Sequence, residues 1–131
     1  MKIGLDLHGV SDAYPEFFST LSKLFVDAGH EVHIMTGELV TDALHEQLEK
    51  CNVQYTHLFS ILQYHTDKGT TIREDEQGNK WIDDDIWNKA KGDYARQHGL
   101  DIVLDDTEVY SEHFTTPFIY CKAFNKLGGR R

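Results

Sequence analysis

Three apolar segments of this chain each run directly into residues that carry a carboxylate or a hydroxyl group. Asp6 ends the segment KIGLD, Thr36 ends VHIMT, and Asp105 and Asp106 follow IVL. Lys91 lies between the second and third of these segments, in WNKAK. A carboxylate can attack phosphorus as a nucleophile, and carboxylates together with phosphate oxygens are the ligands that Mg²⁺ prefers. These residue types therefore suit metal-assisted phosphoryl transfer, provided that the fold brings them together.

The elements that must position these residues follow from the hydrophobic pattern. Strands are predicted at residues 2–7, 31–35, within 55–61, at 101–104 and at 118–121. Helices are predicted from a cap at Ser11 or Asp12, with Pro15 in the first turn, to 28, from about 40 to 51, and from the acidic triplet 83–85 to about 98. Gly29 and Gly99 are the stops of the first and third. This alternation favours one α/β domain over residues 1–131, a three-layer, doubly wound parallel sheet with helices on both faces.

The ends of the predicted strands are where the chemistry is expected. In an open parallel sheet, ligands bind beyond the carboxyl ends of the strands, so Asp6, Thr36 and Asp105 should meet in one crevice. Two adjacent carboxylates at the end of a buried strand are costly unless a cation compensates them, which favours Mg²⁺ as the cofactor. Because strand side chains alternate, one of Asp105 and Asp106 should bind the metal directly and the other through water or a backbone donor.

The segment between the second predicted helix and the third is expected to carry a small flap at about residues 62–84. Residues 70–83 are predicted to form a β-hairpin turned at Gly78 and Asn79, a dipeptide suited to the positive φ angles of a tight turn. So small a cap would leave the site open, which suits either a bulky phosphorylated substrate or a partner subunit that covers the site.

The succession of Asp6, Thr36, Lys91 and the pair Asp105 and Asp106 resembles the haloacid dehalogenase (HAD) superfamily of aspartate-nucleophile phosphohydrolases, over most of the chain. The resemblance implies a HAD-like, Rossmannoid fold and a Mg²⁺-dependent phosphatase that cleaves a phosphate monoester through an aspartyl phosphate on Asp6. The metal ligands that it implies are Asp6, the backbone carbonyl of His8, Asp105 and, in support, Asp106. Sugar phosphates, nucleotides and phosphorylated macromolecule ends are all expected substrate classes.

Thr36, Gly37 and a lysine are expected to bind the phosphate. By the resemblance, Thr36 contacts the transferring phosphoryl group. Gly37 lacks a side chain, which would let its backbone approach the ligand, and the helix that follows would add its N-terminal amides. Lys89 and Lys91 both lie on the third predicted helix, and Lys91 is preferred because Lys89 points further toward solvent.

His8 departs from the HAD pattern, because most HAD phosphatases have Asp two residues after the nucleophile. In the family that residue protonates the leaving alcohol and then activates water. Histidine can do both near neutral pH, since its ordinary pKa is about 6.5, so His8 is a candidate general acid and base. The alternative is a non-catalytic substitution, which would leave a weak or inactive HAD-like protein that binds metal or phosphate or docks a partner. Phosphoryl transfer to an acceptor other than water ranks last, because nothing marks an acceptor site.

Composition excludes several other classes. The net charge of −9 argues against a general nucleic-acid binder, which needs clustered Lys and Arg; a nucleotide or a phosphorylated end stays open. No apolar run approaches the roughly 20 residues that span a membrane, and a charged strand stands where a signal peptide would begin. Cys51 and Cys121 are too few for a disulfide framework. A cytoplasmic protein without membrane contact is expected, and an oligomer stays open.

Three weaker features complete the interpretation. His30 and His33 lie three apart on a predicted strand, so they face opposite sides and do not share a metal site. Tyr64, Trp81 and Trp87 are interpreted as core or cross-strand residues in preference to the lining of a substrate opening. The tail at residues 127–131 is expected to fray.

Overall fold

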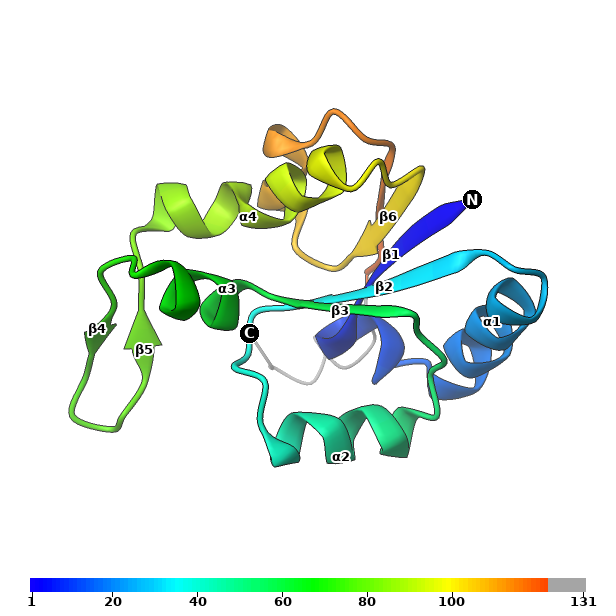
Figure 1. Cartoon of the computed structure of the whole chain (residues 1–131), viewed down its shortest axis with the longest axis horizontal. Helices are drawn as coiled ribbons and strands as arrows, with labels where there is room; N and C mark the ends of the chain where they lie inside the picture. Colours follow the sequence, from blue (N-terminus) through cyan, green and yellow to red (C-terminus); the bar gives the residue numbers. More distant parts are fainter. Residues whose placement is uncertain (123–131) are drawn as a thin grey trace.

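A five-stranded parallel sheet forms the centre of the protein in the computed structural model, which describes residues 1–122 (Figure 1). The strands are β1 (Lys2–Asp6), β2 (Glu31–Thr36), β3 (His57–Ser60), β6 (Ile102–Asp105) and β7 (Phe118–Tyr120). Their order in the sheet is β3-β2-β1-β6-β7, and every neighbouring pair is parallel. The predicted α/β class with a parallel sheet is confirmed.

The direction of winding changes at β1. From β1 the chain passes to β2 and then to β3 on one side, and it later returns to form β6 and β7 on the other. In open α/β sheets the crevice beyond the carboxyl ends of the strands at such a switch point is the place where ligands bind. Here the two strands at the switch point are β1 and β6, which end at Asp6 and Asp105.

Helices cover both faces of the sheet and produce two hydrophobic cores (Figure 1). On one face, α1 (Pro15–Asp27) and α2 (Asp42–Cys51) contribute Phe18, Leu44 and Leu48 to a core with β1 and β2. On the other face, α4 (Asp84–Gln97) contributes Ala90 and Tyr94 to a second core. The short 3₁₀ helix η2 (Glu108–His113) packs beside α4. Sequence periodicity did not predict η2.

Two glycines allow close approaches that the fold requires. A Cβ at Gly4, in the middle of β1, would lie 2.6 Å from the sulfur of Met35 and 2.9 Å from Val103. A Cβ at Gly92, on α4, would lie 2.3 Å from the backbone oxygen of His113. Gly92 thus lets η2 lie directly against α4, and this contact brings the η2 residues to the carboxyl end of the sheet.

The segment 62–84 differs from the expected β-hairpin flap, because it starts inside a helix, α3 (Ile61–Lys68). The Ser60 hydroxyl caps α3 by accepting from the Gln63 N–H at 2.9 Å, and Gly69 ends it in a left-handed conformation with φ of 84°. Serine and glycine at these places are the sequence signals of a short helix. A helix of eight residues shows little hydrophobic periodicity, so the periodic pattern did not predict α3.

The hairpin itself is smaller than predicted. It pairs β4 (Arg73–Glu74) with β5 (Lys80–Trp81) and has a five-residue loop between them. Asp75 organises that loop, since its carboxylate accepts from the N–H groups of Gln77 and Asn79 at 3.0 and 2.9 Å. The expected tight turn on Gly78 and Asn79 is therefore wrong, although Gly78 does have a positive φ of 81°.

Smaller departures concern the helix faces and the tail. Phe17, Leu24 and Val40 follow the apolar spacing of α1 and of the predicted second helix, but their side chains are exposed, so the buried stripe is narrower than the pattern indicates. The tail, 127–131, lies outside the described residues. Within residues 1–122 no helix is both long enough and apolar enough to cross a membrane.

Candidate active site

Three aspartates meet at the carboxyl ends of β1 and β6. Asp6 is the last residue of β1, Asp105 is the last residue of β6, and Asp106 follows directly. All three are buried, with exposed fractions of 6%, 0% and 1%. One carboxylate oxygen from each lies within 4.8 Å of the other two. The tertiary fold thus brings together the acidic residues that the sequence placed at strand ends.

Lys91 lies between two of these carboxylates. Its Nζ donates to Oδ1 of Asp6 at 2.9 Å and to Oδ2 of Asp105 at 2.7 Å, and its side chain is buried. Lys91 reaches the site from α4, two turns after the helix begins. Lys89, on the same helix, is exposed and lines a different cavity. Of the two candidate lysines, Lys91 is therefore the one in the site.

Backbone and hydroxyl donors fix the carboxylates further. The N–H of Leu7 donates to Oδ1 of Asp6 at 3.0 Å, and the N–H of Thr107 donates to Oδ1 of Asp105 at 2.9 Å. The Thr107 hydroxyl donates to Oδ1 of Asp106 at 3.3 Å. These contacts orient the carboxylates before any ligand binds, which is the preorganisation that an electrostatic site requires.

The charges of this cluster do not balance. Three ionised carboxylates and one ammonium leave a formal charge of −2 in a buried space, and desolvation makes such an excess unfavourable. Burial raises the pKa of the Asp6 carboxyl, the Lys91 ammonium opposes that shift, and Asp105 and a hydrogen bond from Asp106 reinforce it. Burial alone would lower the pKa of Lys91, but Asp6 and Asp105 outweigh burial and raise it. A divalent cation would offset the excess negative charge and favour the ionised form of Asp6.

A cavity of about 250 Å³ opens next to Asp6 and Lys91. Thr36, the last residue of β2, lines it, as do Gly37 and His8. The sequence-predicted phosphate-binding residues and the acidic cluster are thus parts of one site. The Thr36 hydroxyl accepts from the N–H of Glu38 at 3.3 Å, so its own proton is directed elsewhere.

Gly37 has a packing role in addition to the expected one. A Cβ at this position would lie 2.6 Å from two carbons of the Trp87 indole. Trp87 packs over the backbone of Gly37, so the missing side chain makes room for an aromatic ring at the cavity that both residues line. The expected contribution of the next helix is wrong. Helix α2 begins only at Asp42, and none of its residues lines this cavity in the described part of the chain.

His8 lies at the cavity with both ring nitrogens engaged. Its Nδ1 pairs with Asp12 at 2.9 Å, and its Nε2 pairs with Glu38. The hydrogen bond that the ring donates to Asp12 raises the pKa of His8 to about 9, with burial opposing and Glu38 in support. The ring is therefore an imidazolium at neutral pH. It faces the cavity instead of packing against α1, and it carries positive charge toward the place where phosphate is expected.

Sequence analysis missed Glu38, Tyr110 and Thr107, whereas Trp87 packs against the second core, as predicted, and also lines the cavity. Trp87 lines the cavity and donates from Nε1 to the Tyr110 hydroxyl at 2.6 Å. The Tyr110 ring centroid lies 5.4 Å from the Lys91 Nζ, within the range of a cation–π contact. Glu38 lies two residues after Thr36, in the loop after β2. This closeness in sequence to a predicted site residue was the one signal that could have identified Glu38. Tyr110 has no local signal, because the packing of η2 on α4 brings it to the site.

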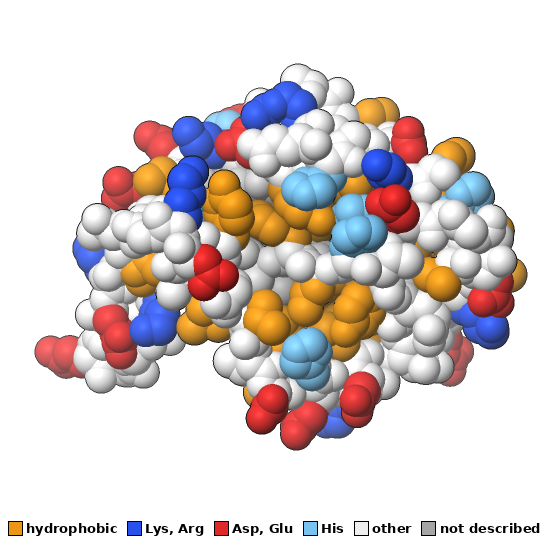
Figure 2. Space-filling model, viewed as in Figure 1, with side chains coloured by type: hydrophobic (Ala, Val, Ile, Leu, Met, Phe, Trp, Pro, Cys, Tyr) orange, Lys and Arg blue, Asp and Glu red, His pale blue; other side chains and the backbone are white. Residues whose placement is uncertain are grey.

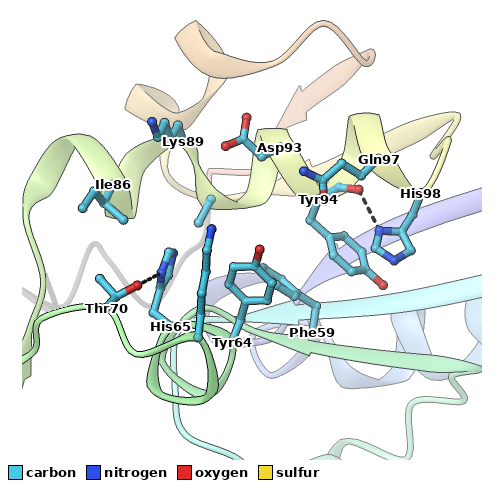
Figure 3. A pocket seen from close by; sticks show the side chains of 12 residues that line it. Phe59, Tyr64, His65, Thr70, Ile86, Lys89, Asp93, Tyr94, Gln97 and His98 are labelled. Atoms are coloured by element: carbon cyan, nitrogen blue, oxygen red, sulfur yellow. Dashed lines mark hydrogen bonds between the residues drawn. The ribbon is translucent and has the colours of Figure 1, made fainter.

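A larger cavity lies elsewhere. It measures about 590 Å³, lies between α3 and α4, and is lined by aromatic side chains, among them Phe59, Tyr64 and Tyr94 (Figure 3). None of the three aspartates lines it. Of the three aspartates only Asp6 lines the smaller cavity, where it meets Lys91 and His8, and we assign the chemistry to that cavity for this reason.

Comparisons with protein-family models, with curated proteins and with solved structures found no match to this chain. The fold and the site give a more general description of the protein. It is an α/β protein with a five-stranded parallel sheet flanked by helices, and it holds three aspartates and a lysine at the carboxyl ends of its central strands.

Proposed function

We propose that this protein is a Mg²⁺-dependent phosphohydrolase of the HAD type, which cleaves a phosphate monoester through an aspartyl phosphate on Asp6. The observation that carries the proposal is the buried cluster of Asp6, Asp105 and Asp106 around Lys91 at the switch point of a parallel sheet. The expected HAD order of functional groups is kept, with Thr36 at the end of the neighbouring strand.

The donor set suits Mg²⁺. Asp6 and Asp105, with Asp106 in support and the backbone carbonyl of His8 as the family pattern implies, would hold the ion through oxygen atoms alone, which a small hard cation prefers. The bound ion would neutralise the charge that develops on the phosphoryl oxygens. The formal charge of the cluster, −2, matches that of one divalent cation.

The remaining residues bind and orient the substrate. Lys91 and Thr36 line the cavity and would contact the phosphoryl oxygens, and Gly37 would supply backbone next to Thr36. Asp6 attacks phosphorus, and the bond to the leaving alcohol breaks. The His8 imidazolium can give the alcohol its proton, and the neutral ring can then take a proton from the water that hydrolyses the aspartyl phosphate. To do so, Nε2 must exchange its contact with Glu38 for one with the substrate.

One observation favours the alternative, a HAD-like protein that binds metal or phosphate without catalysis. Both nitrogens of His8 are held in ion pairs with Asp12 and Glu38. If those pairs persist when substrate binds, the site has no acid at this position, and the imidazolium serves only to attract an anion.

Phosphate release from a panel of monoesters, measured with and without Mg²⁺, tests the proposal. We expect release that requires Mg²⁺ and is lost in Asp6→Asn, while Asp85→Asn, an exposed control in the first turn of α4, keeps wild-type activity. General acid–base catalysis is worth about 10²- to 10⁴-fold, so His8→Gln should lower kcat by that amount if His8 is the acid. Equal inactivity of wild type and Asp6→Asn, with Mg²⁺ still bound, would instead support the binding protein.

A further inference from the structure

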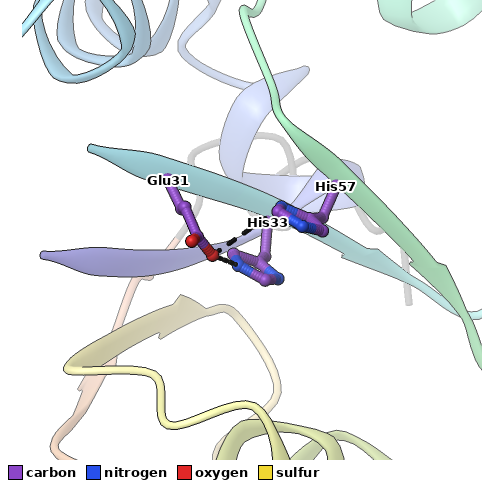
Figure 4. A group of neighbouring side chains, drawn as sticks. All are labelled: Glu31, His33 and His57. Carbon is purple, nitrogen blue, oxygen red and sulfur yellow. Dashed lines mark hydrogen bonds and ion pairs between the residues drawn. The ribbon is translucent and has the colours of Figure 1, made fainter. Parts of the chain in front are cut away.

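A second group of metal-ligating side chains lies at the opposite end of the sheet from Asp6 (Figure 4). Glu31 and His33 are the first and third residues of β2, so they project from the same face of that strand. His57 is the first residue of β3 and is the register partner of His33. The three side chains therefore lie side by side on two neighbouring strands. His30, the other histidine near β2, is not part of the group.

The ligating atoms are close to the spacing of a metal site. One ring nitrogen of each histidine and a carboxylate oxygen of Glu31 lie within 4.8 Å of one another. His33 Nε2 is 2.8 Å from Glu31 Oε1, and His57 Nδ1 is 3.8 Å from the same oxygen. Tetrahedral zinc with bonds of about 2.0–2.1 Å needs donors roughly 3.3 Å apart. The His33–Glu31 pair is thus about half an ångström closer than that spacing, and the His57–Glu31 pair is about half an ångström wider.

The side chains that must move are partly exposed, and His57 must also exchange the contact of its Nδ1 with the Thr56 hydroxyl, at 2.8 Å, for the ion. His57 and Glu31 have exposed side-chain fractions of 47% and 38%, whereas that of His33 is 1%. The two imidazole rings stack at 4.2 Å with an interplanar angle of 4°. Parallel stacked rings do not direct their lone pairs to one point, so His57 must turn about its side-chain bonds to meet an ion. Rotation of a half-exposed ring requires no change in the strands.

His33 has the partner that a ligating histidine requires. Its Nδ1 lies 2.6 Å from the Tyr94 hydroxyl, so the ring is held with Nε2 directed at Glu31 (Figure 4). Metal-bound histidines almost always use the other ring nitrogen in this way, which sets the tautomer and the orientation of the ring. Histidine and acidic side chains lie next to one another on the face shown in Figure 2. Glu31 and His57 are partly exposed, so an ion can reach the group from solvent.

We propose that Glu31, His33 and His57 form a binding site for a transition-metal cation, with Zn²⁺ as the best match, distinct from the Mg²⁺ site at Asp6. Two imidazoles and one carboxylate suit Zn²⁺, whereas Mg²⁺ selects oxygen ligands alone. The three protein ligands leave the fourth position to water or a small ligand. The ion joins the start of β2 to the start of β3 and ties the edge strand to the sheet. This assignment is independent of the proposed phosphatase activity.

Titration of the full chain with ZnCl₂ by isothermal calorimetry, in excess Mg²⁺ to occupy the acidic cluster, tests the site. We expect one Zn²⁺ per chain in the wild type and in His45→Ala, whose exposed histidine lies on α2. Loss of an outer partner of a metal ligand weakens binding about 10- to 100-fold. Loss of a ligand itself should cost at least as much, so Glu31→Gln and His57→Ala should weaken Zn²⁺ binding at least tenfold. Equal Zn²⁺ affinity in wild type, Glu31→Gln and His57→Ala, or no binding by the wild type, overturns the proposal.

A second readout separates ligation from a change in fold. Addition of Zn²⁺ should shift the side-chain ¹⁵N resonances of His33 and His57 and leave those of His45 in place. Tyr94→Phe keeps both ligating histidines and removes the hydroxyl at Nδ1, so it should weaken Zn²⁺ binding about 10- to 100-fold. Far-UV circular dichroism of each variant without metal should match the wild type. Zn²⁺-induced shifts in histidines outside the group, with His33 and His57 unmoved, would contradict the assignment.

Discussion

Replacement of Lys91 by methionine tests the electrostatic account of the acidic cluster directly. The ammonium lies 2.9 Å from Asp6 and 2.7 Å from Asp105, and each contact is worth about 6 kcal/mol of attraction at an effective dielectric near 20. Most of that attraction offsets the desolvation of the charges. Removal of one partner of a buried pair leaves the others uncompensated and costs about 3–5 kcal/mol. We expect Lys91→Met to lower the free energy of unfolding by that amount.

The matched control is Lys89→Met, on the same helix but exposed. Surface changes of this kind alter stability by less than about 0.5 kcal/mol. Urea unfolding at pH 7.5 in EDTA, followed by circular dichroism, measures both variants. Mg²⁺ should restore part of the stability of Lys91→Met, because a cation at the carboxylates replaces the lost ammonium. An equal loss in Lys89→Met and Lys91→Met would refute the reasoning.

The pH dependence of stability tests the same electrostatic account, because the direction of its change can be predicted. Burial raises the pKa of Asp6 in the folded protein, and Lys91 opposes that rise. A group whose folded pKa is raised contributes stability below its unfolded pKa, about 3.9 for Asp, and loses it as the pH rises through the folded value. Without Lys91 the pKa of Asp6 rises further. Lys91→Met should therefore gain more stability than the wild type when the pH is lowered from 8 to 6 in EDTA.

Two further substitutions probe individual packing and hydrogen-bond contacts through their effect on stability. Gly37→Ala should lower the free energy of unfolding by about 1–3 kcal/mol, because the new methyl group would lie 2.6 Å from the Trp87 indole; urea unfolding in a Trp87→Leu background should show a smaller loss, and an equal loss in both backgrounds contradicts the contact. Burial lowers the pKa of His65, whose Nδ1 lies 2.7 Å from the Thr70 hydroxyl. The folded state therefore resists protonation of this ring, and stability should fall as the pH drops below the unfolded value of about 6.5. The slope of melting temperature against pH between 7 and 5 should be shallower in His65→Gln, and an unchanged slope rules out His65 as the source.

The two ends of the sheet offer different chemistry for a simple reason. The three aspartates at the carboxyl ends are buried and present oxygen atoms alone, which suits a hard cation. The group at the amino ends of β2 and β3 adds two imidazoles and is partly open to solvent, which suits Zn²⁺. Mg²⁺ and Zn²⁺ should therefore bind without competing when both are present.

Much of the acidic site could be predicted from the sequence. Apolar runs mark the buried strands, and parallel pairing brings their carboxyl ends to one edge, so Asp6, Thr36 and Asp105 had to lie near one another. Helical spacing separated Lys91 from Lys89, because these two residues face different directions on α4. Both predictions rest on hydrophobic and helical spacing within one segment, and this spacing can be read from a single sequence.

The tertiary structure alone decided the partners of these residues. His8 meets Glu38, 30 residues away, and His33 meets His57 across two strands. Tyr110 reaches Lys91 because Gly92 lets η2 lie against α4, and Gly37 packs against the Trp87 ring. Such contacts depend on which distant segments become neighbours and how closely they pack, and no periodic pattern within either segment specifies that.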